Sequence, residues 1–293
     1  YYCNHELMHW KIKLAMIIKN LDKAKQAKRT IPDGVYFISL EDGVHNPFKA
    51  PVLSFSSEQK LVAANKVVLI PDNEALDGYA SLFNRIDHAN QLNPYELRSA
   101  KIFWRGQNTG KLLEEDSVKA YPRLSLLQLS AGKNFVDAAF TKYVFLKANK
   151  EYNFEKDMHA NRAYLTKNFP LKNYVTPEQS VQYKYLLDVD GHSCSYSRMA
   201  WILYSNSLLM KHKSNKIQWY YSQIKPNIHY LPIEEDFSNL QQQFNWAEQH
   251  PEEVKKITAN ARVLAQELFS EKNIVNATID GFLAYNKVLY EKN

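Results

Sequence analysis

Hydrophobic and polar positions along the first third of the chain predict one long helix followed by short strands. Residues 5–28 carry apolar side chains at helical spacing with lysines opposite, which is the pattern of an amphipathic helix. Three short apolar runs then predict strands, at residues 35–40, 52–56 and 67–70. Residues 74–91 return to helical spacing. This alternation predicts an α/β first domain over residues 1–97.

The pattern breaks around Asn93-Pro94-Tyr95, and a second alternation of strands and helices follows. Apolar runs predict strands at residues 101–104, 134–140, 185–189, 208–211 and 229–233. Helical spacing predicts helices at residues 122–131, 157–167, 195–207, 238–250, 251–269 and 272–290. Strands that alternate with helices are typical of a parallel sheet. The sequence therefore predicts a second α/β domain over residues 98–270, followed by a C-terminal helix within residues 271–293.

The composition is that of a soluble globular protein, since 45% of the 293 residues are hydrophobic and 23% are charged. The longest apolar runs, such as residues 14–18, are too short to cross a bilayer. A formal net charge of +6 favours an anionic partner, such as a sugar nucleotide, a phosphorylated glycolipid or a membrane surface. Nucleic acid is not expected, because the chain has neither zinc-finger spacing nor an RNP-type aromatic motif.

The cysteines and the first helix indicate in which cellular compartment the protein is expected. Cys3 and Cys194 are too few for a disulfide framework, which favours a reducing compartment. No secretory signal is visible, so we expect a cytoplasmic protein. The basic run at residues 19–29 is read as the solvated face of a packed helix. The alternative is a helix that lies on the inner face of the cytoplasmic membrane as a peripheral contact.

The strand at residues 185–189 stops at Asp190-Gly191, and a helix with Arg198 near its start follows. A strand, a glycine turn and a helix N-terminus favour anion binding, because free backbone N–H groups and the helix dipole point at the ligand. Arg198 adds a planar, permanently charged fork. The pattern predicts a phosphate or diphosphate site, and Arg105 at another strand end is a second candidate contact. The alternative for both arginines is an ordinary surface position.

Three segments carry a resemblance to a known family: YKYLLDVDG with the arginine-started helix after it, SNSLLMK, and WYYSQIKPNIHYLPI. They resemble glycosyltransferase family 90, the CAP10-like family of fungal capsule-associated proteins, protein O-glucosyltransferases and bacterial lipopolysaccharide core transferases of the LpsA type. The interval from Gly191 to Arg198 is one residue longer than the usual interval between this glycine and this arginine in that family. The resemblance implies a GT-B fold, with two Rossmann-like domains facing a central cleft and the C-terminal helix crossing back to the first domain.

The resemblance also implies a donor site for a UDP-sugar in the second domain. Donor diphosphate contacts are implied at Arg105, Arg198, Ser195 and Ser193. Nucleoside and loop contacts are implied at Phe135, Val136, Asp137, Asp190, Gly191 and His192. Two cations at a diphosphate can replace the metal ion that other transferases use, so neither a metal nor a cofactor is expected. Asp188-Val189-Asp190 looks like a metal-binding Asp-x-Asp motif, but we interpret it as a strand end, with metal binding as the alternative.

An inverting transfer needs a base that takes the proton from the acceptor hydroxyl. The resemblance places the catalytic aspartate after a strand of the first domain, where VYFISLED supplies Asp42, with Glu41 as the fallback. From the residues alone, a turn residue before Gly43 is the better interpretation of Asp42, and it is the resemblance that favours catalysis.

The implied function is an inverting, metal-independent glycosyltransferase that moves a hexose, glucose above all, from a UDP-sugar to a glycan hydroxyl. The acceptor favoured is the lipopolysaccharide or lipooligosaccharide core. Two alternatives stay open: O-glycosylation of a protein serine, and binding of a nucleotide sugar without catalysis.

Overall fold

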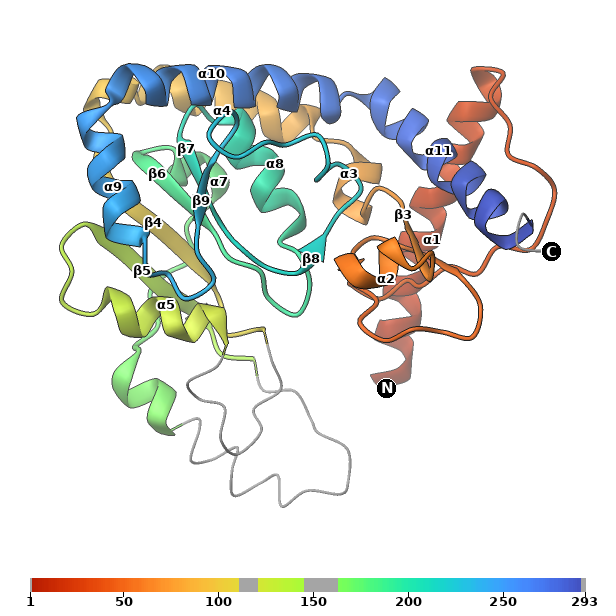
Figure 1. The fold of residues 1–293 in the computed structure, drawn as a ribbon, viewed down its shortest axis with the longest axis horizontal. Helices are drawn as coiled ribbons and strands as arrows, with labels where there is room; N and C mark the ends of the chain where they lie inside the picture. Colours follow the sequence, from red (N-terminus) through yellow and green to blue (C-terminus); the bar gives the residue numbers. More distant parts are fainter. Residues whose placement is uncertain (1, 111–120, 145–162, 291–293) are drawn as a thin grey trace. The chain divides into compact units, whose positions relative to one another are not determined.

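The computed structural model describes residues 2–110, 121–144 and 163–290, with the side chains of residues 2–7 left out. The chain forms two compact units (Figure 1). Unit 1 comprises Tyr1–Asn84, Asn215–Lys225 and Arg262–Asn293, and unit 2 comprises Arg85–Ser214 and Pro226–Ala261. The division at residues 84 and 85 lies before the expected boundary at residue 98. Residues 215–225 return to unit 1, which the predicted continuous second domain did not include.

Unit 1 is built from short strands and from helices at both ends of the chain. Its strands are β1 (Val52–Ser54), β2 (Ser57–Glu58), β3 (Val67–Leu69) and β8 (Lys216–Ile217). Its helices are α1 (Tyr2–Gln26), α2 (Gln59–Ala63), α3 (Asn73–Asp77), the start of α4 (Ala80–Leu92) and α11 (Glu271–Tyr290), with the end of α10 (Pro251–Leu268). β1 pairs with β3 in parallel, and β2 pairs with β8 antiparallel. The C-terminal helix α11 packs on α1, where Ala24 meets Val275 and Ile279.

Two predictions for unit 1 need correction. The strand expected at residues 35–40 is a single bridge from Ile38 to Leu53, flanked by two backbone hydrogen bonds of 2.8 and 2.9 Å. Val35 and Phe37 are exposed, so no packed layer extends the pairing. The helix expected at residues 74–91 is two helices, α3 and α4, because Gly78 has a φ of +101° that a helix does not permit.

Unit 2 contains a parallel sheet, which confirms the α/β class. The strand order in its described residues is β5-β4-β6-β7-β9. The strands are β4 (Ser99–Gln107), β5 (Val136–Lys142), β6 (Tyr183–Asp188), β7 (Leu208–His212) and β9 (Leu231–Ile233). The helices are α5 (Pro122–Ser130), α7 (Pro177–Ser180), α8 (Tyr196–Tyr204), α9 (Leu240–Gln249) and most of α4 and α10, with the short 3-10 turn η1 (Tyr95–Leu97) before β4. Residues 163–168 are helical as predicted, and residues 157–162 of that prediction lie outside the described residues.

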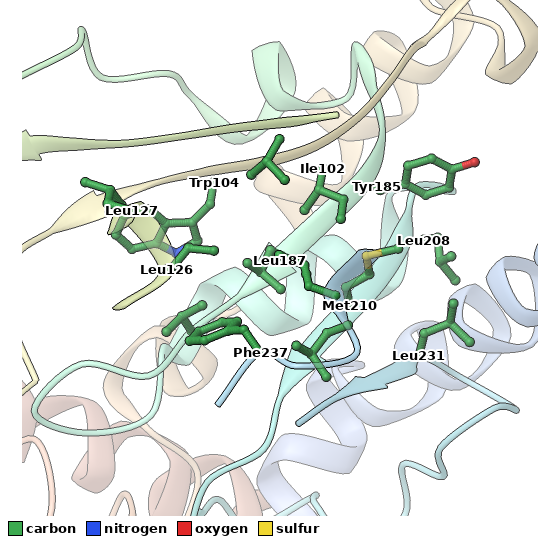
Figure 2. Packing of buried hydrophobic residues seen from close by; sticks show 14 of the residues in the cluster. Ile102, Trp104, Leu126, Leu127, Tyr185, Leu187, Leu208, Met210, Leu231 and Phe237 are labelled. Carbon is green, nitrogen blue, oxygen red and sulfur yellow. The ribbon is translucent and has the colours of Figure 1, made fainter. Parts of the chain in front are cut away.

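The core of unit 2 follows the alternation of side chains along its strands. Ile102, Trp104, Tyr185, Leu187 and Met210 share one face and pack with leucines of α5 (Figure 2). The intervening residues of β4 and β6 face α8, which is buried along most of its length. With both faces covered, the strands read as continuous apolar runs, as a buried parallel sheet requires. No helix in the described ranges is long and apolar enough to cross a membrane.

Candidate functional site

The carboxyl ends of β4, β6 and β7 lie at one edge of the parallel sheet, and this edge carries the candidate site. β6 ends at the buried Asp188, and α8 begins at Tyr196 after a seven-residue turn with Ser195 in the N-cap position. In open α/β sheets, ligands bind outside the carboxyl ends of the strands, next to helix N-termini. The predicted turn therefore lies where an anion would be bound.

Arg198 is the third residue of α8 and lies over the ring of Trp104, 5.6 Å from guanidinium carbon to ring centroid. Among the residues that the structure describes, its guanidinium has no hydrogen-bond or ion-pair partner. Burial lowers the pKa of Arg198, and the carboxylate of Asp188 opposes that shift. A partly buried cation that has no partner among the described residues, at a helix start, favours an anionic ligand.

Arg123, near the start of α5, was missed by the sequence analysis. Its Nε and Nη2 donate to the carbonyl oxygen of Val189 at 3.2 and 3.0 Å, and its Nη1 donates to Thr109 Oγ1 at 2.6 Å. Burial lowers its pKa to about 10, and the charge of Arg198 adds to that effect. Arg123 thus binds the turn after β6 to the loop after β4, and two guanidiniums lie near the same edge.

Gly191 lies in close contact with both of those groups. A Cβ atom at this position would come within 2.5 Å of Thr109 Oγ1 and 2.9 Å of Arg123 Cζ. The turn predicted from Asp190-Gly191 therefore needs glycine for space. The backbone of residue 191 can lie this close to the loop after β4 only because glycine has no side chain.

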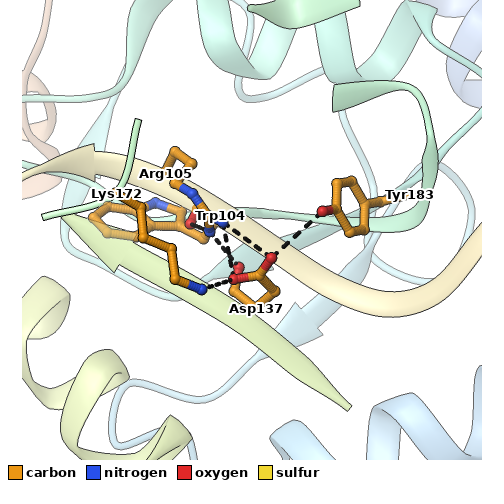
Figure 3. Close-up of polar contacts among 5 residues, drawn as sticks. All are labelled: Trp104, Arg105, Asp137, Lys172 and Tyr183. Atoms are coloured by element: carbon orange, nitrogen blue, oxygen red, sulfur yellow. Dashed lines mark hydrogen bonds and ion pairs between the residues drawn. The ribbon is translucent and has the colours of Figure 1, made fainter. Parts of the chain in front are cut away.

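Arg105, the other predicted diphosphate contact, is held in an ion-pair cluster (Figure 3). Its Nη2 donates to both carboxylate oxygens of Asp137 at 2.9 and 3.0 Å, and Lys172 Nζ lies 2.8 Å from the same carboxylate. Tyr183 completes the cluster with a hydrogen bond of 3.4 Å to Asp137. Burial raises the pKa of Asp137, but Arg105 and Lys172 outweigh it and the net pKa is lowered.

Arg105 and Arg198 nevertheless line one cavity of about 150 Å³ between β4, β6 and α8. Tyr174 and Trp201 lie in the same wall. The structure thus brings the two predicted arginines to one cavity, although Arg105 already has a partner there.

The nucleoside contacts implied at Phe135 and Val136 are placed elsewhere. Val136 opens β5 and is buried in the core, and Phe135 stacks on Phe244 of α9 at 4.9 Å between centroids. Because β5 runs parallel to β4, these residues lie at the amino end of the strand. The structure does not bring them to the edge where Gly191 and Arg198 lie.

The remaining loop residues are near the turn. Ser195 Oγ donates to Asp188, and Asp190 accepts from Ser214 Oγ at 2.6 Å. Ser193 Oγ lies 3.3 Å from the hydroxyl of Tyr196, and its carbonyl oxygen accepts from Gly191 N at 2.9 Å. His192 is half-buried in the same turn. These contacts join the predicted loop to the end of β6 and to the segment after β7.

The predicted base Asp42 belongs to unit 1. Its Oδ1 lies 3.1 Å from Nζ of Lys13, a buried lysine of α1 that also donates to the carbonyl oxygen of Leu40 at 2.8 Å. The side chain of Asp42 is 67% exposed, and Glu41 is also exposed. Lys13 therefore contacts and orients a carboxylate that is accessible from solvent.

We predicted no role for Lys13, Arg123 or Lys211 from the sequence. Each lies in a segment whose pattern is typical of a packed core or a solvated surface. Lys211 falls within the apolar strand LLMKH, and Arg123 directly follows the Pro122 that opens α5. A charged residue at a buried position of an apolar run is the available signal, since such a group needs a partner.

The chain belongs to glycosyl transferase family 90, because the profile of that family matches residues 46–293. This confirms the resemblance carried by the DG turn and the segments after it.

Named relatives fit this assignment. Protein O-glucosyltransferase 2 of Danio rerio is 26% identical over 281 residues, covering 90% of this chain and 48% of the relative. Protein O-glucosyltransferase 3 of Homo sapiens is 28% identical over 172 residues, which is 58% of this chain and 29% of the relative. O-glucosyltransferase LpsA of Dichelobacter nodosus is 26% identical over 92 residues, covering 31% of this chain and 29% of the relative. The chain thus spans about half the length, or less, of these relatives.

Solved structures with a similar trace are more distant. HepE of Anabaena in complex with UDP-glucose has a TM-score of 0.44 at 12% identity, covering 82% of this chain and 65% of HepE. A glycosyltransferase from Rickettsia africae has a TM-score of 0.45 at 13% identity, with coverage of 94% and 81%.

Proposed function

We propose that this chain is a glycosyltransferase that moves a hexose, glucose above all, from a UDP-sugar to a hydroxyl of a glycan. The observation that carries the proposal is the guanidinium of Arg198, which lies without a described partner at the start of α8 in a chain of family 90. The names of the relatives support glucose as the transferred sugar. The GT-B arrangement of two lobes around a cleft is part of the same proposal.

In this account the donor diphosphate binds at the start of α8. As the bond between the sugar and the diphosphate breaks, negative charge accumulates on the leaving UDP, and a fixed cation there stabilises the transition state. Arg198 and the N–H groups of α8 supply that stabilisation, and Arg123 holds the turn in place from behind. Arg105 is the second predicted contact. To bind the diphosphate, its guanidinium would give up a hydrogen bond to Asp137 and donate to a phosphate oxygen instead. No metal ion takes part.

The acceptor is activated from unit 1. The carboxylate of Asp42 takes the proton of the acceptor hydroxyl, the oxygen attacks the anomeric carbon from the side opposite UDP, and UDP leaves with the bonding electron pair. The product carries the inverted anomeric configuration. Lys13 keeps the carboxylate oriented for this transfer.

The glycan acceptor we favour is the lipopolysaccharide or lipooligosaccharide core at the cytoplasmic membrane face, which the LpsA relative and the net charge of +6 support. A second candidate acceptor is a serine of a folded protein. The longer match to proteins named protein O-glucosyltransferase favours that candidate.

Transfer from radiolabelled UDP-glucose to two acceptor panels tests the proposal, one of core oligosaccharides and one of folded protein domains. We expect label on the core panel, with the inverted anomer seen by NMR, and we expect EDTA to leave the rate unchanged. Asp42→Asn should bind UDP as the wild type does and lose transfer by at least about a hundredfold. Glu41→Gln is the matched control and should stay active. Donor binding without transfer or hydrolysis on either panel would support a non-catalytic nucleotide-sugar-binding protein instead.

A further inference from the structure

Lys211 is a charged residue inside the apolar strand β7, where all five residues are buried. Its side chain is 7% exposed. Burial lowers the pKa of its ammonium, but two neighbouring carboxylates raise it more, so the net pKa is above the ordinary value. Lys211 is therefore a buried cation held by specific partners rather than a neutral packing residue.

Those partners are the two carboxylates of the motif that looks like a metal-binding Asp-x-Asp. Lys211 Nζ lies 2.9 Å from Asp188 Oδ2 and 3.0 Å from Asp190 Oδ1. Asp188 is fully buried and Asp190 is 3% exposed. Register explains the geometry, because Asp188 and Lys211 are paired positions of β6 and β7. A divalent cation bound by both carboxylates would have to take the position of this ammonium.

The same carboxylates hold both ends of the turn before α8. Asp188 accepts a hydrogen bond from Ser195, the N-cap residue of α8. Asp190 accepts one from Ser214, which follows β7. A single ammonium between the two carboxylates thus connects the end of β6, the turn and the start of the helix that carries Arg198.

We propose that Lys211 is the internal cation of the Asp188 and Asp190 pair: it occupies the place of a divalent ion and positions the turn and the start of α8. The motif is then a filled cation site, and the lysine is a positioning residue for the anion site. The statement that this anion site takes a donor diphosphate rests on the proposed function.

The first experiment measures Mn²⁺ binding by electron paramagnetic resonance, in which bound Mn²⁺ disappears from the free-ion signal. Lys211→Ala should gain one Mn²⁺ site relative to the wild type, and adding Asp190→Asn should remove it. Lys213→Ala is the matched control, since Lys213 lies just beyond β7 with a 64% exposed side chain paired to Glu234 at 3.0 Å. It should gain no site. A Lys211→Ala protein without the new site, or a wild type with a site that Asp190→Asn removes, overturns the proposal.

The second experiment measures UDP affinity by calorimetry in EDTA. Lys211→Ala should bind UDP at least tenfold more weakly than the wild type, and methylammonium should restore part of the loss. A general loss of structure would not respond to a small amine. Lys213→Ala should bind as the wild type does. Unchanged UDP affinity in Lys211→Ala overturns the positioning role.

The two experiments separate the inference from the proposed function. If the wild type binds no nucleotide, the proposed function fails, and the Mn²⁺ result still decides whether Lys211 fills the cation site. If Lys211→Ala does not fold, the wild type decides: UDP affinity that neither EDTA nor Mn²⁺ changes supports the inference, and affinity that requires Mn²⁺ overturns it.

Discussion

The guanidinium of Arg123 donates two hydrogen bonds to the carbonyl oxygen of Val189, the residue that follows strand β6. This contact holds Arg123 on the turn, while the carboxylates of Asp188 and Asp190 oppose the repulsion between Arg123 and Arg198. Arg123 uses its N–H groups in hydrogen bonds to the turn, whereas the N–H groups of Arg198 have no described partner. We therefore expect Arg123 to hold the turn in place and Arg198 to contact the ligand.

Replacing Arg123 tests that division of roles. Arg123→Lys keeps the charge but cannot reproduce the fork that reaches Val189 and Thr109 together. We expect the free energy of unfolding to fall by about 1–3 kcal/mol, and UDP affinity to fall as well. Urea denaturation and calorimetry measure the two effects. A variant that matches the wild type in both would contradict the structural role.

Gly191→Ala should disturb the same turn by a steric clash, without any change of charge. Its Cβ would lie 2.5 Å from Thr109 Oγ1 and 2.9 Å from Arg123 Cζ, so these side chains or the turn itself must shift. We expect a loss of about 1–3 kcal/mol in stability together with weaker nucleotide binding. Gly34→Ala is the control, because its Cβ would meet its nearest atom at 3.5 Å and should be tolerated. Equal melting temperatures for the two variants would show that the close contact does not matter.

Arg105→Ala and Arg198→Ala should differ in whether they lower the stability of the fold or the affinity for UDP. Arg105→Ala removes the hydrogen bonds from Nη2 to the carboxylate of Asp137, and we expect a cost of about 1–3 kcal/mol in stability. Arg198→Ala removes no described hydrogen bond, so its stability should stay within about 1 kcal/mol of the wild type. Its UDP affinity should fall by about 10- to 100-fold, as expected for a lost charge-assisted contact. Thermal melts and calorimetry on both variants give the comparison, and a strongly destabilised Arg198→Ala would count against the account.

Asp72 gives unit 1 a pH dependence of its own. This buried carboxyl caps α3 by accepting from the backbone N–H groups of Glu74 and Ala75. Burial, with the charge of Glu74, raises its pKa from 3.8 to about 7. The folded protein therefore holds a proton that the unfolded chain releases, so the stabilisation is full below about pH 4 and is lost as the pH rises through 7.

Asp72→Asn should remove this dependence, because asparagine stays neutral and is also a good N-cap. At pH 8 the variant should be more stable than the wild type, by up to about 4 kcal/mol at about 1.4 kcal/mol per unit. Melting temperatures from pH 5 to pH 8 measure the difference. The exposed Asp77→Asn, in the same helix, is the control. Parallel pH profiles for wild type and Asp72→Asn would refute the assignment.

Much of the fold could be predicted because its signals are local. The strands of unit 2 are continuous apolar runs, and helices such as α5 and α8 have helical spacing. The strand expected at residues 35–40 could not be excluded from sequence, because these residues form a nearly continuous apolar run and only their lack of packing partners limits the pairing to one bridge. The return of residues 215–225 to unit 1 depends on contacts far apart in the chain.

The candidate site was predictable only in part. Gly191 and Arg198 stand out because a turn and a helix start have recognisable chemistry. Arg105 looked like a free cation, since no local signal shows that Asp137 of the next strand lies beside it. Phe135 and Val136 were assigned by analogy, and their place in the core depends on the direction and register of β5.

Thermal stabilisation by nucleoside diphosphates, with EDTA present, tests the central claim most directly. UDP should raise the melting temperature of the wild type more than ADP, GDP or CDP do, and Arg198→Ala should abolish that rise while Lys213→Ala keeps it. A wild type that no nucleotide stabilises, or an Arg198→Ala variant that UDP stabilises fully, would contradict a donor site at the start of α8.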